Sequence, residues 1–483
     1  MQTITRTTRL ARSLTARADY PGASVARGAA VATIALGYLV AQQGLSLQTG
    51  AIFGLAFLAA VMGGFVYVPW VIVPMIIPFY VVLPTLQIFI NPLLGGLKDL
   101  VSIAAIGAAG VLLVQRRAAR LPLQLDTVSA VLFGLIVSLY LANIGGNLTG
   151  ESGYGAPWYQ GVRLFCQPLA LLVVGMVLPE PRRTFRAAAL SMIVTSVAVA
   201  AIGLLQQAIG VEGLIGLGYE YGEQVRQIGP RLRSFGTLSE PFSYASILLL
   251  GLAVMLMWTR RGIVSYLVVP IIVAGLVVSY VRTAAVIVVA LLGLTLARRG
   301  QKLFAAVLLS GAAIAGTTVL VAATGQTQTR SVGVSPTTYL TLNGRTTLWE
   351  SQIGDSPADW TFGRGVGAVG TAAKRADQTL TGKKKLNSQA STTVVDSGYL
   401  TVVADIGIVG LVLLLALFSR LLALGWRLGR HGELRGWVTV AILVVLMLDA
   451  LSRESFTGFP TAYLGMLLIG LGVAHLPDAQ AEG

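Results

Sequence analysis

Five arginines that fall near predicted helix ends or in polar loops are the residues best suited to do chemistry in this chain. A guanidinium group binds phosphate oxygens through two parallel hydrogen bonds, which suits a pyrophosphate at a membrane surface. The turn that holds Arg282 is very short, and a charge near hydrocarbon there costs roughly 2.5–3.5 kcal/mol, so such charges tend to be functional. Contact with lipid headgroups, or pairing with Glu240 and Asp355, is the alternative explanation. The five arginines are Arg163, Arg231, Arg233, Arg282 and Arg345.

Two carboxylates near these arginines are candidate general bases, which would accept a proton from a hydroxyl group. Glu240 stands at the start of one predicted helix, and Asp396 precedes another. The positive end of a helix favours an acidic side chain, and this alone could explain both residues. Asp405 and Asp449 fall within apolar segments, where we expect them to pair with neighbouring groups.

Other chemistries lack the residues that they need. No cluster of His, Cys and carboxylate residues has the spacing of a metal site, and no cofactor is predicted. The segment GVGAVG at 365–370 matches a dinucleotide-binding pattern, but no βαβ unit surrounds it, so we predict a flexible turn. The formal net charge is +15, yet the basic residues are scattered through short loops, which argues against nucleic-acid binding.

The composition indicates that helices in a lipid bilayer position these residues. Of 483 residues, 55% are hydrophobic and only 11% are charged, and the mean hydropathy is +0.77, whereas a soluble domain needs more charge. Backbone groups in lipid must bond within their own segment, so we predict an all-α polytopic membrane protein with about fourteen transmembrane helices. These helices are expected near 29–43, 50–68, 70–90, 100–114, 126–143, 162–178, 187–209, 241–258, 263–280, 282–297, 303–323, 399–424, 437–451 and 460–474.

Loop charges predict the orientation in the membrane. With the N-terminus inside, most Lys and Arg residues fall in inner loops, so both termini are predicted to be cytoplasmic. The long polar loop between helices 11 and 12 is then outside, with an amphipathic helix at 343–354 and a mobile segment at 371–393. The predicted divisions are a basic cytoplasmic tail (1–28), helices 1 to 11 (29–323), the large extracytoplasmic loop (324–398), helices 12 to 14 (399–474) and a cytoplasmic tail (475–483).

Four segments, taken in order, resemble the O-antigen ligase/polymerase family. They are RSFGTLSEPF at 233–242, SYVRTAA at 279–285, NGRTTLWE at 343–350 with FGRGVG at 362–367, and DSGYL at 396–400 continuing to ADIGIVGL at 404–411. The resemblance covers residues 226–425, and it rests on the order of the segments and on the placement of the large loop.

This resemblance implies transfer of a glycan from a polyprenyl-pyrophosphate carrier, with arginines on the outer face holding the pyrophosphate. Arg282 and Arg345 match the family pattern directly, and Arg233 matches it less closely. Ligases of the family typically have a histidine where this chain has Asp396, and the predicted outer region contains no histidine. The departure favours the polymerase branch, an inverting and metal-independent glycosyltransferase of the bacterial inner membrane whose active site faces outside.

Two other functions remain open from the sequence. A ligase of the same family would move the glycan to a lipid or protein acceptor. A flippase for lipid-linked oligosaccharides can also have about fourteen helices, although flippases usually show two similar halves and no large outer loop. The expected partners are polyprenyl-pyrophosphate-linked glycans as donor and acceptor and the lipid bilayer, with a flippase and a chain-length regulator as further candidates.

Overall fold

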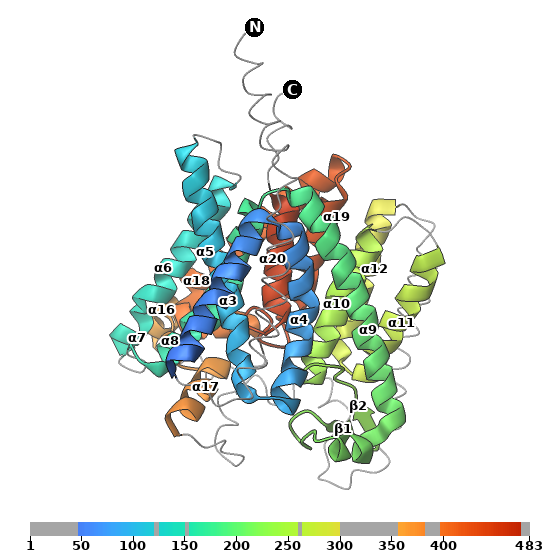
Figure 1. The fold of residues 1–483 in the computed structure, drawn as a ribbon. Helices are drawn as coiled ribbons and strands as arrows, with labels where there is room; N and C mark the ends of the chain where they lie inside the picture. The colour runs from blue at the N-terminus through green and yellow to red at the C-terminus, as the bar shows by residue number, and fades with distance from the viewer. Residues whose placement is uncertain are drawn as a thin grey trace.

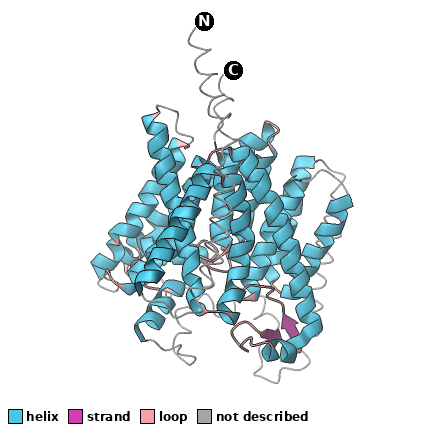
Figure 2. Ribbon diagram, in the orientation of Figure 1, coloured by secondary structure: helices cyan, strands magenta, loops and turns pink. Residues whose placement is uncertain are grey.

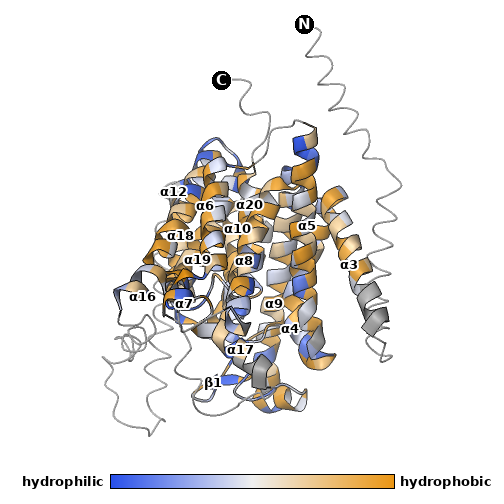
Figure 3. Cartoon of the chain, turned by 90° about the vertical axis from the view of Figure 1, so that its left-hand side faces the viewer, coloured by the Kyte–Doolittle hydropathy of each residue, from blue (hydrophilic) through white to orange (hydrophobic). Residues whose placement is uncertain are grey.

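The computed structural model describes residues 47–119, 125–149, 154–258, 263–299, 356–381 and 397–474. Figures 1 and 2 show these residues as a bundle of helices with one small β-hairpin at its lower end. Six of the described helices are long and apolar enough to cross a membrane, and five more are apolar but shorter. Figure 3 shows hydrophobic residues along the helices and hydrophilic ones gathered near their ends. The chain is an all-α integral membrane protein.

The first part of the described chain is built from α-helices that run almost without interruption. Val68 separates the first two helices, so they are two elements rather than one irregular helix. The second connection, between the helices at 69–89 and 97–118, contains a short 3₁₀ helix, η2 (Pro92–Gly96). The α-helices are α3 (Leu47–Tyr67), α4 (Pro69–Phe89), α5 (Leu97–Ala118), α6 (Thr127–Ala142), α7 (Ile144–Thr149), α8 (Ala156–Val177) and α9 (Pro181–Gly216).

The second part begins with the hairpin and returns to helices. Strands β1 (Arg226–Ile228) and β2 (Arg231–Arg233) pair antiparallel. Tyr280, at φ 52°, separates the second and third helices that follow. The helices are α10 (Pro241–Trp258), α11 (Ile263–Ser279), α12 (Arg282–Arg299), α16 (Pro357–Phe362), α17 (Gly370–Thr381), α18 (Gly398–Arg430), α19 (Leu434–Asp449) and α20 (Thr461–Val473).

The helix positions agree with the hydrophobic pattern wherever the structure describes the chain. Each predicted helical range there contains a helix. The ranges 29–43 and 303–323 and the two predicted tails, 1–28 and 475–483, lie outside the described residues. The total of fourteen spans and the orientation therefore stay predictions.

The polar segment that was expected to be mobile is helical in its first part. Gly370–Thr381 forms α17, which packs on α8, and residues 382–393 lie outside the described residues. α16 packs on α18 and α7, and Ser356 begins it with a capping box. The amphipathic helix predicted at 343–354 lies outside the described residues.

The glycine-rich turn at 365–370 is buried, and hydrogen bonds hold it in place. The N–H of Val366 donates to Oδ1 of Asn143 at 2.8 Å, and the N–H of Gly367 donates to Oδ1 of Asp405 at 2.9 Å. Asp405 also accepts a hydrogen bond from the hydroxyl of Tyr140 at 3.2 Å. The predicted flexibility is therefore wrong, because buried polar groups fix the backbone of the turn. The predicted pairing role of Asp405 is confirmed.

Candidate active site

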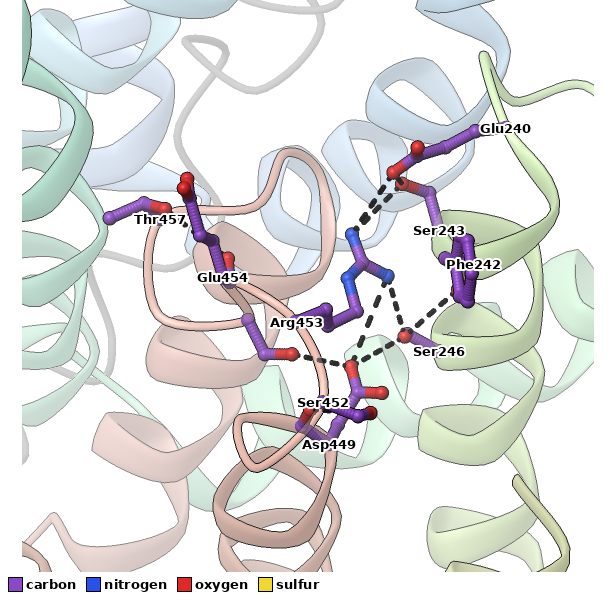
Figure 4. Close-up of polar contacts among 10 residues, drawn as sticks. Glu240, Phe242, Ser243, Ser246, Asp449, Ser452, Arg453, Glu454 and Thr457 are labelled. Carbon is purple, nitrogen blue, oxygen red and sulfur yellow. Dashed lines mark hydrogen bonds and ion pairs between the residues drawn. The ribbon is translucent and has the colours of Figure 1, made fainter. Parts of the chain in front are cut away.

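A polar cluster centres on Arg453, in the connection between α19 and α20, and faces the start of α10. Figure 4 shows the Arg453 side chain reaching from its loop toward Glu240, Ser243 and Ser246. Its Nη2 lies 3.5 Å from Oε1 of Glu240 and 3.1 Å from Oγ of Ser243. Its Nη1 lies 2.8 Å from Oγ of Ser246. One arginine thus joins the connection between α19 and α20 to the first two turns of α10.

Asp449, the last residue of α19, is the buried carboxylate of this cluster. Its Oδ2 accepts hydrogen bonds from Ser246 at 2.7 Å and from Ser455 at 2.6 Å, and it lies 3.9 Å from Nη1 of Arg453. Only 2% of Asp449 is exposed. A buried carboxylate needs such partners, so the predicted pairing role of Asp449 is confirmed.

Glu240 lies immediately before α10, with Pro241 as the first helical residue. Its carbonyl accepts the N–H of Tyr244, and its Oε1 accepts a hydrogen bond from the Ser243 hydroxyl at 3.0 Å. The carboxylate also has Arg453 as an ion-pair partner. Both of the expected structural roles, a place at the start of a helix and pairing with an arginine, therefore hold for Glu240.

Arg233 lies close enough to Glu240 and Arg282 for both to act on it electrostatically. Arg233 is half-buried, and its Nε donates to the carbonyl of Ser279 at 3.3 Å, while its guanidinium lies 4.7 Å from the centre of the Phe242 ring. Burial lowers the pKa of Arg233, the positive charges of Arg226 and Arg282 lower it further, and Glu240 opposes them. We call Arg233 and the two arginines that act on it, Arg226 and Arg282, the Arg233–Arg282 group. Arg282 is exposed at the first residue of α12.

The other predicted arginines are placed differently. Arg163 of α8 forms an ion pair with Asp99 of α5, in which Nε lies 3.0 Å from Oδ1. Ion pairing was one of the roles predicted for Arg163, but Asp99 was not predicted as its partner. Arg231 is exposed on β2. Two further candidates, Arg345 and Asp396, lie outside the described residues.

The sequence interpretation missed Arg453 and Glu454 as site residues. Both oxygens of Glu454 accept from the N–H of Thr371, at 3.1 and 3.3 Å. Burial raises the pKa of Glu454, while the bonds from Thr371 and the charges of Arg375 and Arg453 oppose the rise. A carboxyl with a raised pKa is better suited to accept a proton near neutral pH. The sequence feature that could have identified these two residues is an adjacent Arg and Glu in a short loop that is predicted to lie outside.

The start of α18 contacts the same loop. The Ser397 hydroxyl donates to the carbonyl of Ala450 at 3.1 Å, and the N–H of Gly398 lies 2.9 Å from the carbonyl oxygen of Arg453. Ser397 follows Asp396 in the sequence. The described end of the large loop is thus held against the loop that carries Arg453 and Glu454.

The charged groups of this site are arginines and carboxylates. Among the residues that the structure describes, no group of three or more His, Cys, Asp and Glu side chains could hold a metal ion. The arrangement can bind an oxyanion through the Arg233–Arg282 group and can offer a carboxylate as a proton acceptor. No family model and no curated protein matches this chain.

Proposed function

We propose that this protein is a membrane glycosyltransferase that polymerises polyprenyl-pyrophosphate-linked oligosaccharide units into a surface polysaccharide on the outer face of the bacterial inner membrane. The observation that carries the proposal is the Arg233–Arg282 group beside Glu240 and Arg453, in an apolar helical protein. A lipid pyrophosphate has its charge at the membrane surface and its tail in the bilayer. Arginines at the end of a helical bundle suit such a substrate.

In the proposed reaction, a hydroxyl oxygen of one lipid-linked unit attacks the anomeric carbon of the glycan on a second carrier. A new carbon–oxygen bond forms as the bond from that carbon to the pyrophosphate oxygen breaks, which inverts the anomeric centre. The departing pyrophosphate carries the bonding electron pair. Arg233 and Arg282 stabilise this charge by electrostatics that are in place before the reaction begins.

The proton of the attacking hydroxyl passes to a carboxylate. We assign this role to Asp396, with Glu240 and Glu454 as the competing groups. The carboxylate of Glu240 is already engaged by Arg453 and by the Ser243 hydroxyl. Glu454 has a raised pKa, but the N–H of Thr371 occupies both its oxygens.

Analysis of lipid-linked glycans in a strain that lacks the gene tests this function against its rivals. A polymerase predicts carriers that bear single repeat units in the outer leaflet. Finished polymers that stay on their carrier would instead identify a ligase. Single units retained in the inner leaflet would identify a flippase, and either of these two results would refute the proposal.

A further inference from the structure

Lys98, the second residue of α5, is a buried lysine that forms no ion pair with any carboxylate in the described part of the chain. Only 8% of the residue is exposed. Within the described part of the chain, no carboxylate oxygen lies within 4 Å of its ammonium group. The contact that the structure gives this group is the ring of Phe459, whose centre lies 4.8 Å from Nζ. Burying an ammonium group is costly unless an anion compensates for it, so Lys98 indicates a place for an anion.

Two arginines from other helices add positive charge near Lys98. Arg163 of α8 is joined to Asp99, the residue that follows Lys98, so this carboxylate is already engaged. Arg375 of α17 acts electrostatically on both Lys98 and Arg163. The other nearby carboxylate, Glu454, is shared between Arg375 and Arg453. Lys98, Arg163 and Arg375 therefore lie close enough to act on one another electrostatically, and among the described residues no carboxylate lies within 4 Å of the Lys98 ammonium group.

Aromatic side chains fix this part of the protein. The rings of Tyr80 and Phe459 meet edge to face with centres 5.1 Å apart, and Phe459 contacts Tyr463 in the same way at 5.4 Å. Tyr463 donates to Oε1 of Gln167 at 2.9 Å. These contacts hold the Phe459 ring, and with it the surroundings of the ammonium group, before any ligand arrives.

We propose that Lys98, Arg163 and Arg375 bind a phosphate or pyrophosphate group at a site separate from the Arg233–Arg282 group. The two sites use different elements: α5, α8 and α17 form one, while β1, β2 and α12 form the other. Arg453 and Glu454 lie between them, since Arg453 pairs with Glu240 and Glu454 acts on Arg375.

The identity of the ligand rests on the proposed function. Polymerisation requires two carrier-linked glycans, and each has a pyrophosphate with a different fate. The pyrophosphate of the donor departs, and the exposed Arg282 suits that step. The pyrophosphate of the acceptor stays bonded to its glycan, and the buried Lys98 site suits a group that is held through the reaction.

The test measures how inorganic pyrophosphate shifts the thermal unfolding midpoint of the purified full-length protein. Lys98→Met should weaken this binding about tenfold or more, because it removes a charge-assisted hydrogen bond. The midpoint without ligand should stay the same or rise, since a buried charge is lost. Arg117→Met, at the opposite and exposed end of α5, should behave as wild type. Arg375→Gln should also weaken binding, and it tests the site from another helix if Lys98→Met fails to fold.

Lys98→Met and Arg375→Gln are compared in the Arg282→Ala background, so that pyrophosphate bound by the Arg233–Arg282 group does not mask the Lys98 site. Unchanged pyrophosphate binding after Lys98→Met in that background, or no binding by the wild type, would overturn the proposal. A fall in the ligand-free midpoint with unchanged binding would also do so, because it would mean a purely structural lysine. Arg282→Ala should retain binding at the Lys98 site.

Nanodiscs of phosphatidylcholine that carry either phosphatidylglycerol or polyprenyl pyrophosphate distinguish the source of the phosphate. Stabilisation that depends on Lys98 is expected with polyprenyl pyrophosphate, and stabilisation by phosphatidylglycerol alone would contradict the substrate assignment. If pyrophosphate binds at Lys98 but no polymer forms with the wild type, the proposed function fails and this site stands. Polymer formation with unaffected binding in Lys98→Met would refute this site alone.

Discussion

Arg233 belongs to strand β2 and Arg282 begins helix α12, so only folding brings them close enough to interact electrostatically. The sequence could predict that these charges are unusual, because the positive-inside rule disfavours them in outer loops. It could not predict which of them pair. Asp99 forms an ion pair with Arg163, and Glu240 forms one with Arg453. Both pairs join segments that are far apart in the chain. Helix packing decides such contacts, and the hydrophobic pattern carries little information about packing.

Arg282 is the residue whose role in leaving-group stabilisation can be tested most simply. Arg282→Ala should abolish polymer formation while the protein still inserts and folds, because the residue is exposed at the start of α12. Arg282→Lys should restore activity poorly, since lysine keeps the charge but loses the two-pronged donor geometry. Arg299→Ala, at the other end of α12, is the matched control and should retain activity. A fully active lysine variant would contradict the role of Arg282 as a pyrophosphate clamp.

Three amide substitutions identify the general base. Asp396→Asn should lose about 10²–10⁴-fold in turnover on purified lipid-linked substrate, because the amide cannot accept the proton. Glu240→Gln and Glu454→Gln are the comparison variants, and each should lose far less. Loss in Glu240→Gln alone would place the base at α10, and loss in Glu454→Gln alone would place it in the loop before α20. Full activity in all three would leave catalysis to positioning and to the arginines.

Hydrophobic length was enough to predict the long apolar helices but not α16 and α17, the two described helices of the large polar loop. A helix of about twenty apolar residues spans the hydrocarbon layer, so an apolar run of this length clearly predicts a membrane helix. Gly370–Thr381 is polar, and it is a helix because one face packs on α8 and its start is held by Glu454. The turn at 365–370 is fixed in the same way by Asp405 and Asn143. Partners of this kind come from distant parts of the chain.

The ion pair between Asp126 and Arg420 should make the joint between α6 and α18 sensitive to acid. Oδ1 of Asp126 lies 2.6 Å from Nη2 of Arg420, and the hydrogen bonds from Arg420 lower the pKa of Asp126 from 3.8 to about 2. Because the folded-state pKa is depressed, this stabilisation is present above pH 4 and is lost as the pH falls toward 2.

Asp126→Asn should lower the free energy of unfolding by about 2 kcal/mol near neutral pH and should flatten the acid limb of the stability curve. Glu180→Gln, which removes an exposed pair with Arg183, is the control and should change stability by less than about 1 kcal/mol. Unfolding in detergent across this pH range provides the measurement. An unchanged acid limb in Asp126→Asn would show that other groups control acid unfolding.

The proposed function requires the candidate site to face outside. We predict that both termini are cytoplasmic and that residues 324–398 are outside, because Lys and Arg are concentrated in the opposite loops. A single cysteine at Ser388, with Cys166 replaced, should react with an impermeant label in whole cells. A cysteine at Arg430, the last residue of α18, should react only after the membrane is permeabilised. The reverse pattern would contradict both the orientation and the outward-facing site.

Reconstitution of the purified protein with a single kind of lipid-linked repeat unit is the most direct test of the central claim. The proposed function predicts a ladder of products that differ by one repeat unit, each on one carrier, with one free polyprenyl pyrophosphate released for every bond formed. Arg282→Ala should form no ladder under the same conditions. A wild-type protein that leaves the single units unextended, or that releases glycan without joining it to another unit, would contradict the claim.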